Sequence, residues 1–174
     1  MKKVLFTILI AIIGINAQDI NIPMSFKANF IQQIKNHKGK VIKYRGKIYY
    51  NNPDTTKWIY RSPTKKEVCS SDGKIIVIDH DLEQASYYRV DRGLNLAKVL
   101  SRAKHHKGNL YVTKYKGKYY TIVLNKRGQI NQIAYKDNLD NTVNLIFTGI
   151  RYSQKPLPSS KFICAKPASY DSIH

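Results

Sequence analysis

The feature that most constrains this chain is an alternation of apolar and charged residues with a period of two. The alternation is clearest between residues 42 and 50, where apolar positions are interleaved with Lys43, Arg45 and Lys47. Successive side chains of an extended strand point to opposite faces, so this pattern is typical of a half-buried antiparallel strand. The segment is predicted to turn Ile48 and Tyr50 inward and its cations outward.

Similar runs recur along the rest of the chain, separated by turn residues. A typical break is Asp72-Gly73, because glycine adopts positive φ without steric cost and aspartate bonds its own backbone. The apolar, β-branched run 75–78 after it is predicted to be a buried strand. The segments predicted as strands are 26–34, 42–50, 57–61, 75–78, 86–90, 110–115, 119–124, 130–135, 143–152 and 162–164.

One segment has a helical period instead. Leu96, Ala97, Leu100 and Ala103 recur at helical spacing, and either Asp91 or Asn95 can cap the start. Basic residues from Arg102 to Lys107 suit a helical C-terminus. This is the only helix that the pattern predicts after the N-terminal leader.

Many antiparallel strands with a single helix imply a mainly β fold, either a strongly curved sheet or an open barrel, in which the helix covers an exposed part. The concave face of such a sheet would carry large Ile, Tyr, Trp and Phe side chains. If one short helix leaves that face underfilled, it is a binding site for an apolar ligand. The alternative is an ordinary closed core, and composition alone favours it.

The N-terminus has the features of a secretory signal. A short basic start is followed by an apolar run from Val4 to Ile15 and by the small residue Ala17. The run is shorter than the ~20 residues that span a bilayer. We therefore expect a signal peptide at 1–17, cleavage before Gln18, and a single exported domain at 18–174 located in the periplasm.

The chain carries 30 Lys and Arg against 11 Asp and Glu, a formal net charge of +19. Charge of this size informs about partners and solubility, not about fold. Nucleic acid is the usual partner of so basic a protein, but an exported chain rarely meets it. Membrane surfaces and acidic protein faces are the expected partners, and no nucleic acid is expected.

Cys69 and Cys164 are the two cysteines. Export would place them where disulfides form. Two readings stay open: separate buried thiols, or a bridge that ties the last predicted strand to the middle of the sheet.

No pattern of catalytic residues is found. Asp79-His80-Asp81 could in principle ligate a metal, but adjacent strand residues point to opposite faces and a tight turn explains both acids. His105-His106 is expected to be a solvated helix end. No Ser or Cys lies in a nucleophile-elbow pattern such as Gly-x-Ser-x-Gly. Neither enzymatic activity, nor a metal, nor a cofactor is expected.

An ordered set of short motifs resembles a known family. The set comprises Phe26-x-x-x-Phe30-x-Gln32, Gly46-Lys47-Ile48-x-x-x-x-Pro53, Trp58, Pro63, Ser71-Asp72-Gly73-Lys74 and Glu83-Gln84. In order and spacing it resembles the outer-membrane lipoprotein carrier family LolA, and a weaker likeness continues through Arg127-Gly128 and 130–162. Each motif is weak alone, whereas the ordered set is fairly specific.

The resemblance implies an incomplete β-barrel lidded by helices, with an apolar cavity for the acyl chains of a lipoprotein crossing the periplasm. It implies as partners acylated lipoproteins, an inner-membrane ABC transporter and an outer-membrane lipoprotein receptor. A monomer is expected. Leu96, Ala97 and Leu100 become lid candidates. The candidates for the cavity lining are Phe26, Phe30, Ile48, Tyr50, Trp58, Tyr60, Ile76, Ile78 and Phe147.

Two departures from the family pattern affect the lid. An arginine that the family links to lid opening is replaced here by Asn52, just before Pro53. The family also has a helix before the first strand, whereas only residues 18–25 are available here and Pro23 interrupts them. Segment 91–107 must then supply most of the lid.

A function of another class remains as the alternative. A basic envelope protein with an ordinary filled core could bind acidic polysaccharide or lipid head groups through its surface. Bound lipid in the purified protein would distinguish the two.

Overall fold

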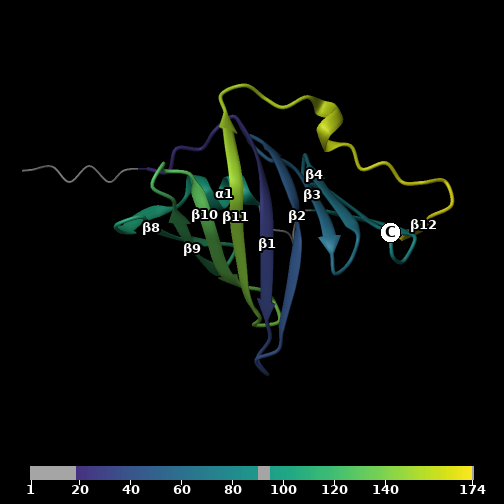
Figure 1. The fold of residues 1–174 in the computed structure, drawn as a ribbon, viewed down its shortest axis with the longest axis horizontal. Helices are drawn as coiled ribbons and strands as arrows, with labels where there is room; N and C mark the ends of the chain where they lie inside the picture. Colours follow the sequence, from purple (N-terminus) through teal and green to yellow (C-terminus); the bar gives the residue numbers. More distant parts are fainter. Residues whose placement is uncertain (1–18, 90–94, 174) are drawn as a thin grey trace, which may run out of the picture.

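The computed structural model describes residues 19–89 and 95–173, and the predicted signal peptide with its cleavage point at Gln18 lies outside them. Within these residues, twelve strands form one sheet in the order β12-β6-β5-β4-β3-β2-β1-β11-β10-β9-β8-β7. Figure 1 shows the long central strands β11, β1 and β2 side by side, with the sheet curving away on both sides of them. The fold is mainly β and the barrel is open, as predicted.

Nine of the ten predicted runs correspond to strands, whereas β4, β7 and β12 were not predicted. The strand bounds are β1 Ser25–Lys35, β2 Val41–Asn51, β3 Thr55–Ser62, β4 Lys66–Ser71, β5 Lys74–Asp79, β6 Gln84–Arg89, β7 Lys104–Lys107, β8 Leu110–Tyr115, β9 Lys118–Leu124, β10 Ile130–Lys136, β11 Thr142–Ser153 and β12 Asp171–Ile173. Neighbouring strands are antiparallel except for the parallel pair β12 and β6.

The register defines two faces of the sheet. We call inner the face that carries Phe26, Phe30 and Trp58, and outer the opposite one. Phe26 lies opposite Tyr50, and Ile48 lies opposite Trp58, so the large residues of β1 to β3 share the inner face. Lys43, Arg45 and Lys47 of β2 lie on the outer face, where the alternation predicted them.

Gly46 on β2 allows two segments to approach closely. A Cβ atom at this position would lie 2.0 Å from the Ile59 carbonyl oxygen and 2.8 Å from the Phe30 ring. The ring of Phe30 therefore occupies the space that any other residue at position 46 would fill.

The predicted helix exists but is shorter than expected. Helix α1 spans Leu96–Ser101, and its N-cap is Asn95, whose side chain accepts a hydrogen bond of 2.9 Å from the Lys98 amide. The prediction that residues as far as Lys107 belong to the helix was wrong. Lys104–Lys107 forms β7 instead, because it pairs with β8 across a turn in which Gly108 has a φ of +56°. Asp91 lies outside the described residues.

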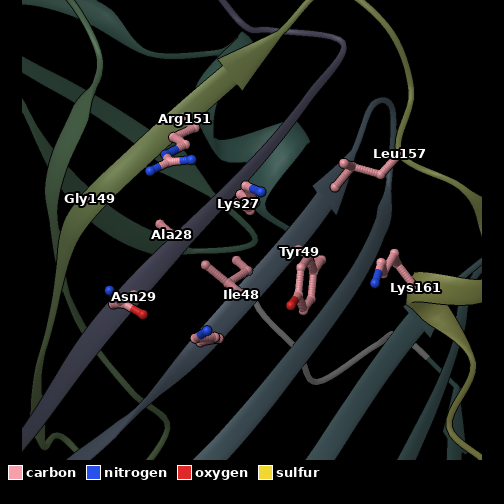
Figure 2. Close-up of a pocket in the computed structure, with 10 residues that line it drawn as sticks. Lys27, Ala28, Asn29, Ile48, Tyr49, Gly149, Arg151, Leu157 and Lys161 are labelled. Carbon is pink, nitrogen blue, oxygen red and sulfur yellow. The ribbon is translucent and has the colours of Figure 1, made fainter.

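The segment after β11 crosses the outer face, and we call residues 154–173 the C-terminal strap. Figure 1 shows the strap in yellow, running from the end of β11 to β12 at the far edge of the sheet. The Asn51 side chain fixes it by donating to the Leu157 carbonyl (3.0 Å) and accepting from the Leu157 amide (2.9 Å). Figure 2 shows Leu157 of the strap near the end of β2 and Lys161 further along the strap, on the 3-10 turn that contacts β3.

A disulfide between Cys69 and Cys164 fixes the strap further along. The bridged reading of the two cysteines is therefore confirmed. The strand predicted at 162–164 was wrong, however, because a 3-10 turn at Ser159–Phe162 and an extended segment occupy this place without pairing to the sheet.

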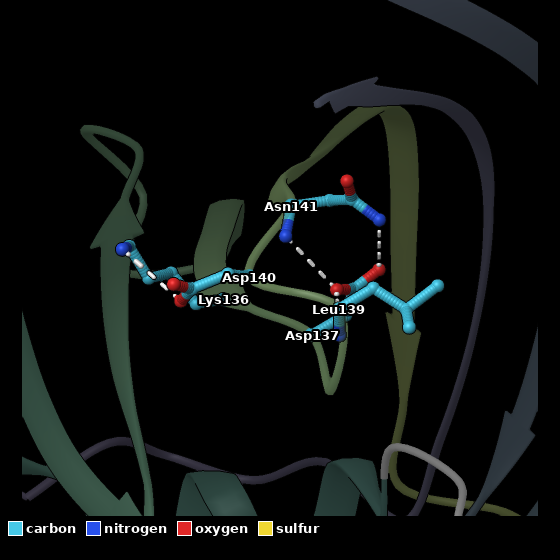
Figure 3. A network of polar contacts seen from close by, with 5 residues as sticks. All are labelled: Lys136, Asp137, Leu139, Asp140 and Asn141. Atoms are coloured by element: carbon cyan, nitrogen blue, oxygen red, sulfur yellow. Dashed lines mark hydrogen bonds and ion pairs between the residues drawn. The ribbon is translucent and has the colours of Figure 1, made fainter. Parts of the chain in front are cut away.

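The turn between β10 and β11 is organised by one carboxylate, as Figure 3 shows. Asp137 accepts hydrogen bonds from the amides of Leu139 and Asn141 and from the Asn141 side chain. Desolvation alone would raise the pKa of Asp137, but these hydrogen bonds and the charge of Lys118 lower it below its usual value.

The described residues before β1 form no helix. Ile20 is buried in the main core, and Ile22 packs against it. This agrees with the argument that the segment is too short and too interrupted for a helix. The segment contributes Ile20 to the core and packs Ile22 against it.

Candidate functional site

The inner face holds the apolar core of the molecule. Most of the predicted lining residues are gathered here. Phe26, Phe30, Ile48, Tyr50, Trp58 and Phe147 are buried members of a single cluster, and Tyr60 packs against it. The cluster draws on β1, β2, β3, β8, β9, β10 and β11, so the sheet wraps around it.

Aromatic rings form a connected set inside this core. Phe26 stacks on Tyr50 with a centroid distance of 4.8 Å. Phe30 meets Trp58 edge to face at 5.1 Å and Tyr60 at 5.0 Å. Trp58 lies 6.3 Å from Phe147, although β3 and β11 are separated by two strands in the sheet. These contacts span the concavity and show how strongly the sheet curves.

A cavity of about 170 Å³ remains beside these rings. Its wall combines Trp58, Val68 and Ile75 from one side of the curved sheet with Tyr135 and Leu145 from the other. The wall is of mixed polarity, because Gln32, Thr56, Tyr60, Ser70 and Tyr135 add polar groups to the apolar side chains. The site is thus a partly apolar hollow in the inner face, suited to the apolar part of a ligand.

Of the nine predicted lining residues, only Trp58 and Tyr60 line this cavity; five others are buried in the adjoining core, and two lie on the other face of the sheet. Ile76 pairs with Cys69 and Ile78 with Glu67, whereas Val68 and Val77 pair with each other on the Trp58 side. Ile76 and Ile78 therefore belong to the outer face, and the structure does not bring them to the cavity. They lie beside the disulfide that holds the strap, and the register explains why Ile78 is buried outside the main cluster.

The lid candidates point into the inner face. Leu96, Ala97 and Leu100 are all buried in the cluster that contains Phe26 and Trp58. Val99, which the helical pattern did not single out, is buried there as well. Helix α1 therefore fills part of the concavity.

Two tyrosine hydroxyl groups, of Tyr60 and Tyr135, belong to the polar part of the cavity wall. Tyr60 donates to the Gln32 side chain at 3.1 Å, and burial raises the pKa of Tyr60 well above its usual range. Burial, with the nearby Tyr120 and Asp137, raises the pKa of Tyr135 to about 12. These phenols stay neutral near neutral pH, which suits an apolar site.

Asn52, which replaces the family arginine, makes a contact of its own. Its side-chain oxygen accepts a hydrogen bond of 3.3 Å from the Tyr50 hydroxyl. Burial, together with the charge of Asp54 and the proximity of Tyr152, raises the pKa of Tyr50 to about 12. Asn52 is thus a neutral partner for a buried phenol.

The acids of the Asp79-His80-Asp81 segment have structural partners. Asp79 accepts hydrogen bonds from the amides of Asp81 and Leu82, and Asp81 accepts one from the Lys65 amide. Across residues 19–89 and 95–173, no group of three or more His, Cys, Asp or Glu side chains gathers as metal ligands would. His105 lies on β7, not at a helix end, and contacts the Gly108 carbonyl oxygen.

Seven of the nine lining residues were not predicted from the sequence: Gln32, Thr56, Val68, Ser70, Ile75, Tyr135 and Leu145. A signal existed for Ile75, because it alternates with Ile76 in the apolar run that was predicted as a strand. Val68 lies in β4, a strand that only the position of Cys69 hinted at.

Comparisons with known proteins agree with this architecture. The sequence model described as "Outer membrane lipoprotein carrier protein LolA" matches residues 23–134. An outer-membrane lipoprotein carrier protein of Campylobacter jejuni is 31% identical over 173 residues, covering 99% of each chain. One from Wolinella succinogenes is 28% identical over 123 residues, covering 71% of this chain and 72% of the other.

Similarity to a solved structure concerns the fold alone. An uncharacterized conserved protein from Thermus thermophilus superimposes with a TM-score of 0.53 at 8% identity, covering 87% of this chain and 91% of that one. In the described ranges of the present chain, no helix is both long enough and apolar enough to cross a membrane.

Proposed function

Because this chain belongs to the outer membrane lipoprotein carrier protein LolA family, we propose that it is a periplasmic chaperone that binds the acyl chains of lipoproteins on its inner face. The observation that carries the proposal is the partly apolar cavity beside Trp58 in the inner face, whose adjoining core includes the buried residues of α1. On this proposal the protein works by binding and release, without catalysis.

The size of the cavity sets a condition on the mechanism. An apolar cavity of roughly 150 Å³ accommodates a molecule such as benzene, so the present one of about 170 Å³ holds only part of an acyl chain. Longer chains require side chains of the core to move aside. The buried residues of α1 are suited to this because six residues on one helix can leave without unpairing any strand.

Binding energy must be limited if cargo is to be released. Burial of an acyl chain contributes ~0.8 kcal/mol for each CH2 group, so several long chains would be held too tightly for transfer. The contacts that α1 loses on opening offset part of this gain. We propose that an inner-membrane ABC transporter loads the carrier and that an outer-membrane lipoprotein receptor with a better-filled cavity unloads it.

The experiment compares one substitution at two positions. Val68 lines the cavity, whereas Val41 is 45% exposed on the outer face. Burying a neutral polar group without a partner costs about 1 to 3 kcal/mol in proteins, and burying an unpaired charge costs more. Val68→Glu should therefore weaken retention of an acylated lipopeptide by roughly tenfold or more, and Val41→Glu should leave it unchanged.

Trp58 gives an independent readout because it forms part of the cavity wall. Its fluorescence should shift when the lipopeptide is added, and mass spectrometry of protein purified from its native host should find bound lipid. Equal retention by the two valine variants, together with an unchanged Trp58 spectrum at saturating ligand, would exclude the cavity as the acyl site. The surface-binding alternative would then be favoured.

A further inference from the structure

A second cavity lies on the outer face, away from the proposed acyl site. It has a volume of about 360 Å³ and is bounded by β1, β2 and β11 and by the strap. Four of the ten residues around it are cations, and none is acidic: the cations are Lys27, Lys47, Arg151 and Lys161. We call this cavity the cationic pocket. Its volume falls in the range of roughly 300 to 1,000 Å³ that is usual for small-molecule sites.

The four cations have no counter-charge within the described residues. Neither of the ion pairs found there involves them, and no hydrogen bond of their side chains is seen in this part of the chain. On the same outer face, by contrast, Lys57 is paired with Glu67 at 2.7 Å. Grouped like charges repel one another, so an uncompensated cluster around a hollow favours an anionic ligand.

A β-bulge brings Arg151 into this group. Phe147 and Arg151 are four residues apart and would share the inner face in a regular strand. The register between β1 and β11 shifts between Lys27 and Asn29, and Gly149 has a φ of +59°. Arg151 consequently lies opposite Lys27 on the outer face. Bulges re-aim side chains in this way and are frequent next to functional sites.

The strap completes the pocket. Leu157 is held by the paired hydrogen bonds to Asn51, and Lys161 follows on the 3-10 turn. Figure 2 shows Leu157 near the end of β2 and Lys161 further from Lys27 and Arg151, on the 3-10 turn that contacts β3. The covalent anchor at Cys164 comes three residues after Lys161. The wall that carries the fourth cation is therefore fixed in place.

We propose that the cationic pocket binds a phosphate group carried by a small ester or by a lipid head group. Arg151 supplies a planar guanidinium that can donate two parallel hydrogen bonds to phosphate oxygens, and the lysines supply compact charges around it. Asn29 offers a neutral amide donor, and Leu157 an apolar contact for the carbon part of the ester. The proposal is independent of acyl binding, since the two cavities lie on opposite faces of the sheet.

The experiment uses the full exported chain and two triple variants of equal charge. The pocket variant carries Lys27→Gln, Lys47→Gln and Arg151→Gln. The control variant carries Lys35→Gln, Lys43→Gln and Arg45→Gln, which are exposed on the outer face of β1 and β2 and do not line the pocket. Titration calorimetry with inorganic phosphate and with glycerol 3-phosphate measures binding. If the triple pocket variant does not fold, the single variant Arg151→Gln replaces it.

Wild type and control should bind the phosphate ester equally. The pocket variant should lose roughly tenfold or more in affinity, because hydrogen bonds to charged groups contribute about a factor of ten each. Equal binding by both triples, no binding of either phosphate probe by wild type, or binding of an acidic peptide in place of phosphate would overturn the proposal.

Vesicles of phosphatidylglycerol identify the source of the phosphate. If glycerol 3-phosphate displaces wild-type protein from the vesicles and the pocket variant does not bind them, the ligand is a lipid head group. If the soluble ester binds in the pocket while vesicle binding is the same for both triples, the ligand is a soluble phosphate ester. Retention of an acylated lipopeptide should be unchanged in both triples.

Discussion

Tyrosine hydroxyls are the main titratable groups next to the inner face. Tyr50, Tyr135 and Tyr152 pack in or against the main core, and burial is the largest cause of their raised pKa values, each about 12. The Tyr152 hydroxyl accepts a hydrogen bond from the Ile130 amide, and this bond lowers the pKa of Tyr152 by less than burial raises it. The phenols are therefore neutral constituents of the core over the physiological pH range.

Alkaline titration should report this burial. Below the ordinary tyrosine pKa of 10.0, folded and unfolded chains both hold these protons. Between pH 10 and about 12 the unfolded chain releases them while the folded chain keeps them, so the free energy of unfolding should fall as pH rises. Chemical denaturation at several alkaline pH values measures the slope. Tyr135→Phe should reduce it, and an unchanged slope would contradict the assignment.

Single residues also show what the sequence could not determine. Alternation separates the side chains of each strand into two sets. It does not say which set of β5 lies on the same face of the sheet as Trp58 of β3. Ile76 and Ile78 were therefore placed with Trp58, although the register puts them opposite. The unbroken apolar run 75–78 is what burial on both faces produces, because the strap covers the outer side. Arg151 was missed because Gly149 interrupts the period of two.

Among the elements, α1 was predicted in place and type but not in length. Its N-cap and its buried positions follow the helical pattern, and Leu96 and Leu100 are both 2% exposed. Residues from Lys104 onward form a strand because they pair with β8. The local helical pattern could not reveal this pairing. Local signals set where a helix begins more reliably than where a neighbouring strand takes over.

The helix can be tested by comparing a buried and an exposed position on it. Leu100→Glu should lower the free energy of unfolding by on the order of 3 kcal/mol, comparable to the loss of a buried leucine side chain, and should weaken retention of acylated cargo. Circular dichroism should show that the sheet remains folded. Ser101→Glu, at an exposed neighbouring position, is the control. Complete loss of the fold in Leu100→Glu would show that α1 is an obligatory core element and not a lid.

The strap depends on its covalent anchor. The Cys69–Cys164 bridge closes a separation of 95 residues, and disulfides that close long loops typically contribute ~2 to 4 kcal/mol. Reduction should lower the free energy of unfolding by this amount, as measured by urea denaturation with and without reductant. Cys69→Ser combined with Cys164→Ser should match the reduced protein. Identical denaturation midpoints in all three samples would mean that the bridge adds no stability.

For the molecule as a whole, the fold divides apolar and charged surfaces between its two faces. The inner face gathers the main core, and the outer face carries cations such as Lys43, Arg45 and Lys47. This division was predicted from alternation alone. The proposed acyl site and the proposed phosphate site follow it, one on each face.

The formal net charge of +19 should raise the rate at which the protein associates with anionic surfaces. Electrostatic attraction to anionic surfaces is screened as the Debye length falls to ~8 Å at physiological ionic strength. We expect association with anionic vesicles to slow markedly between low and physiological salt, while retention of bound acyl chains hardly changes. Stopped-flow rates at several salt concentrations measure the first quantity and cargo dissociation the second. A flat salt dependence of association would leave solubility as the role of the charge.

The length of α1 has a consequence for how the carrier loads. The helix has six residues, and isolated helices below ~12 to 15 residues are marginal in water. If α1 is the lid, its leucines leave the concavity on opening and the helix loses the contacts that stabilise it, so we expect opening to be an order-to-disorder transition and not a rigid-body movement. In the closed protein, α1 itself fills part of the concavity. On this proposal, loading replaces the contacts of α1 with those of cargo, and the affinity for cargo is the difference between the two.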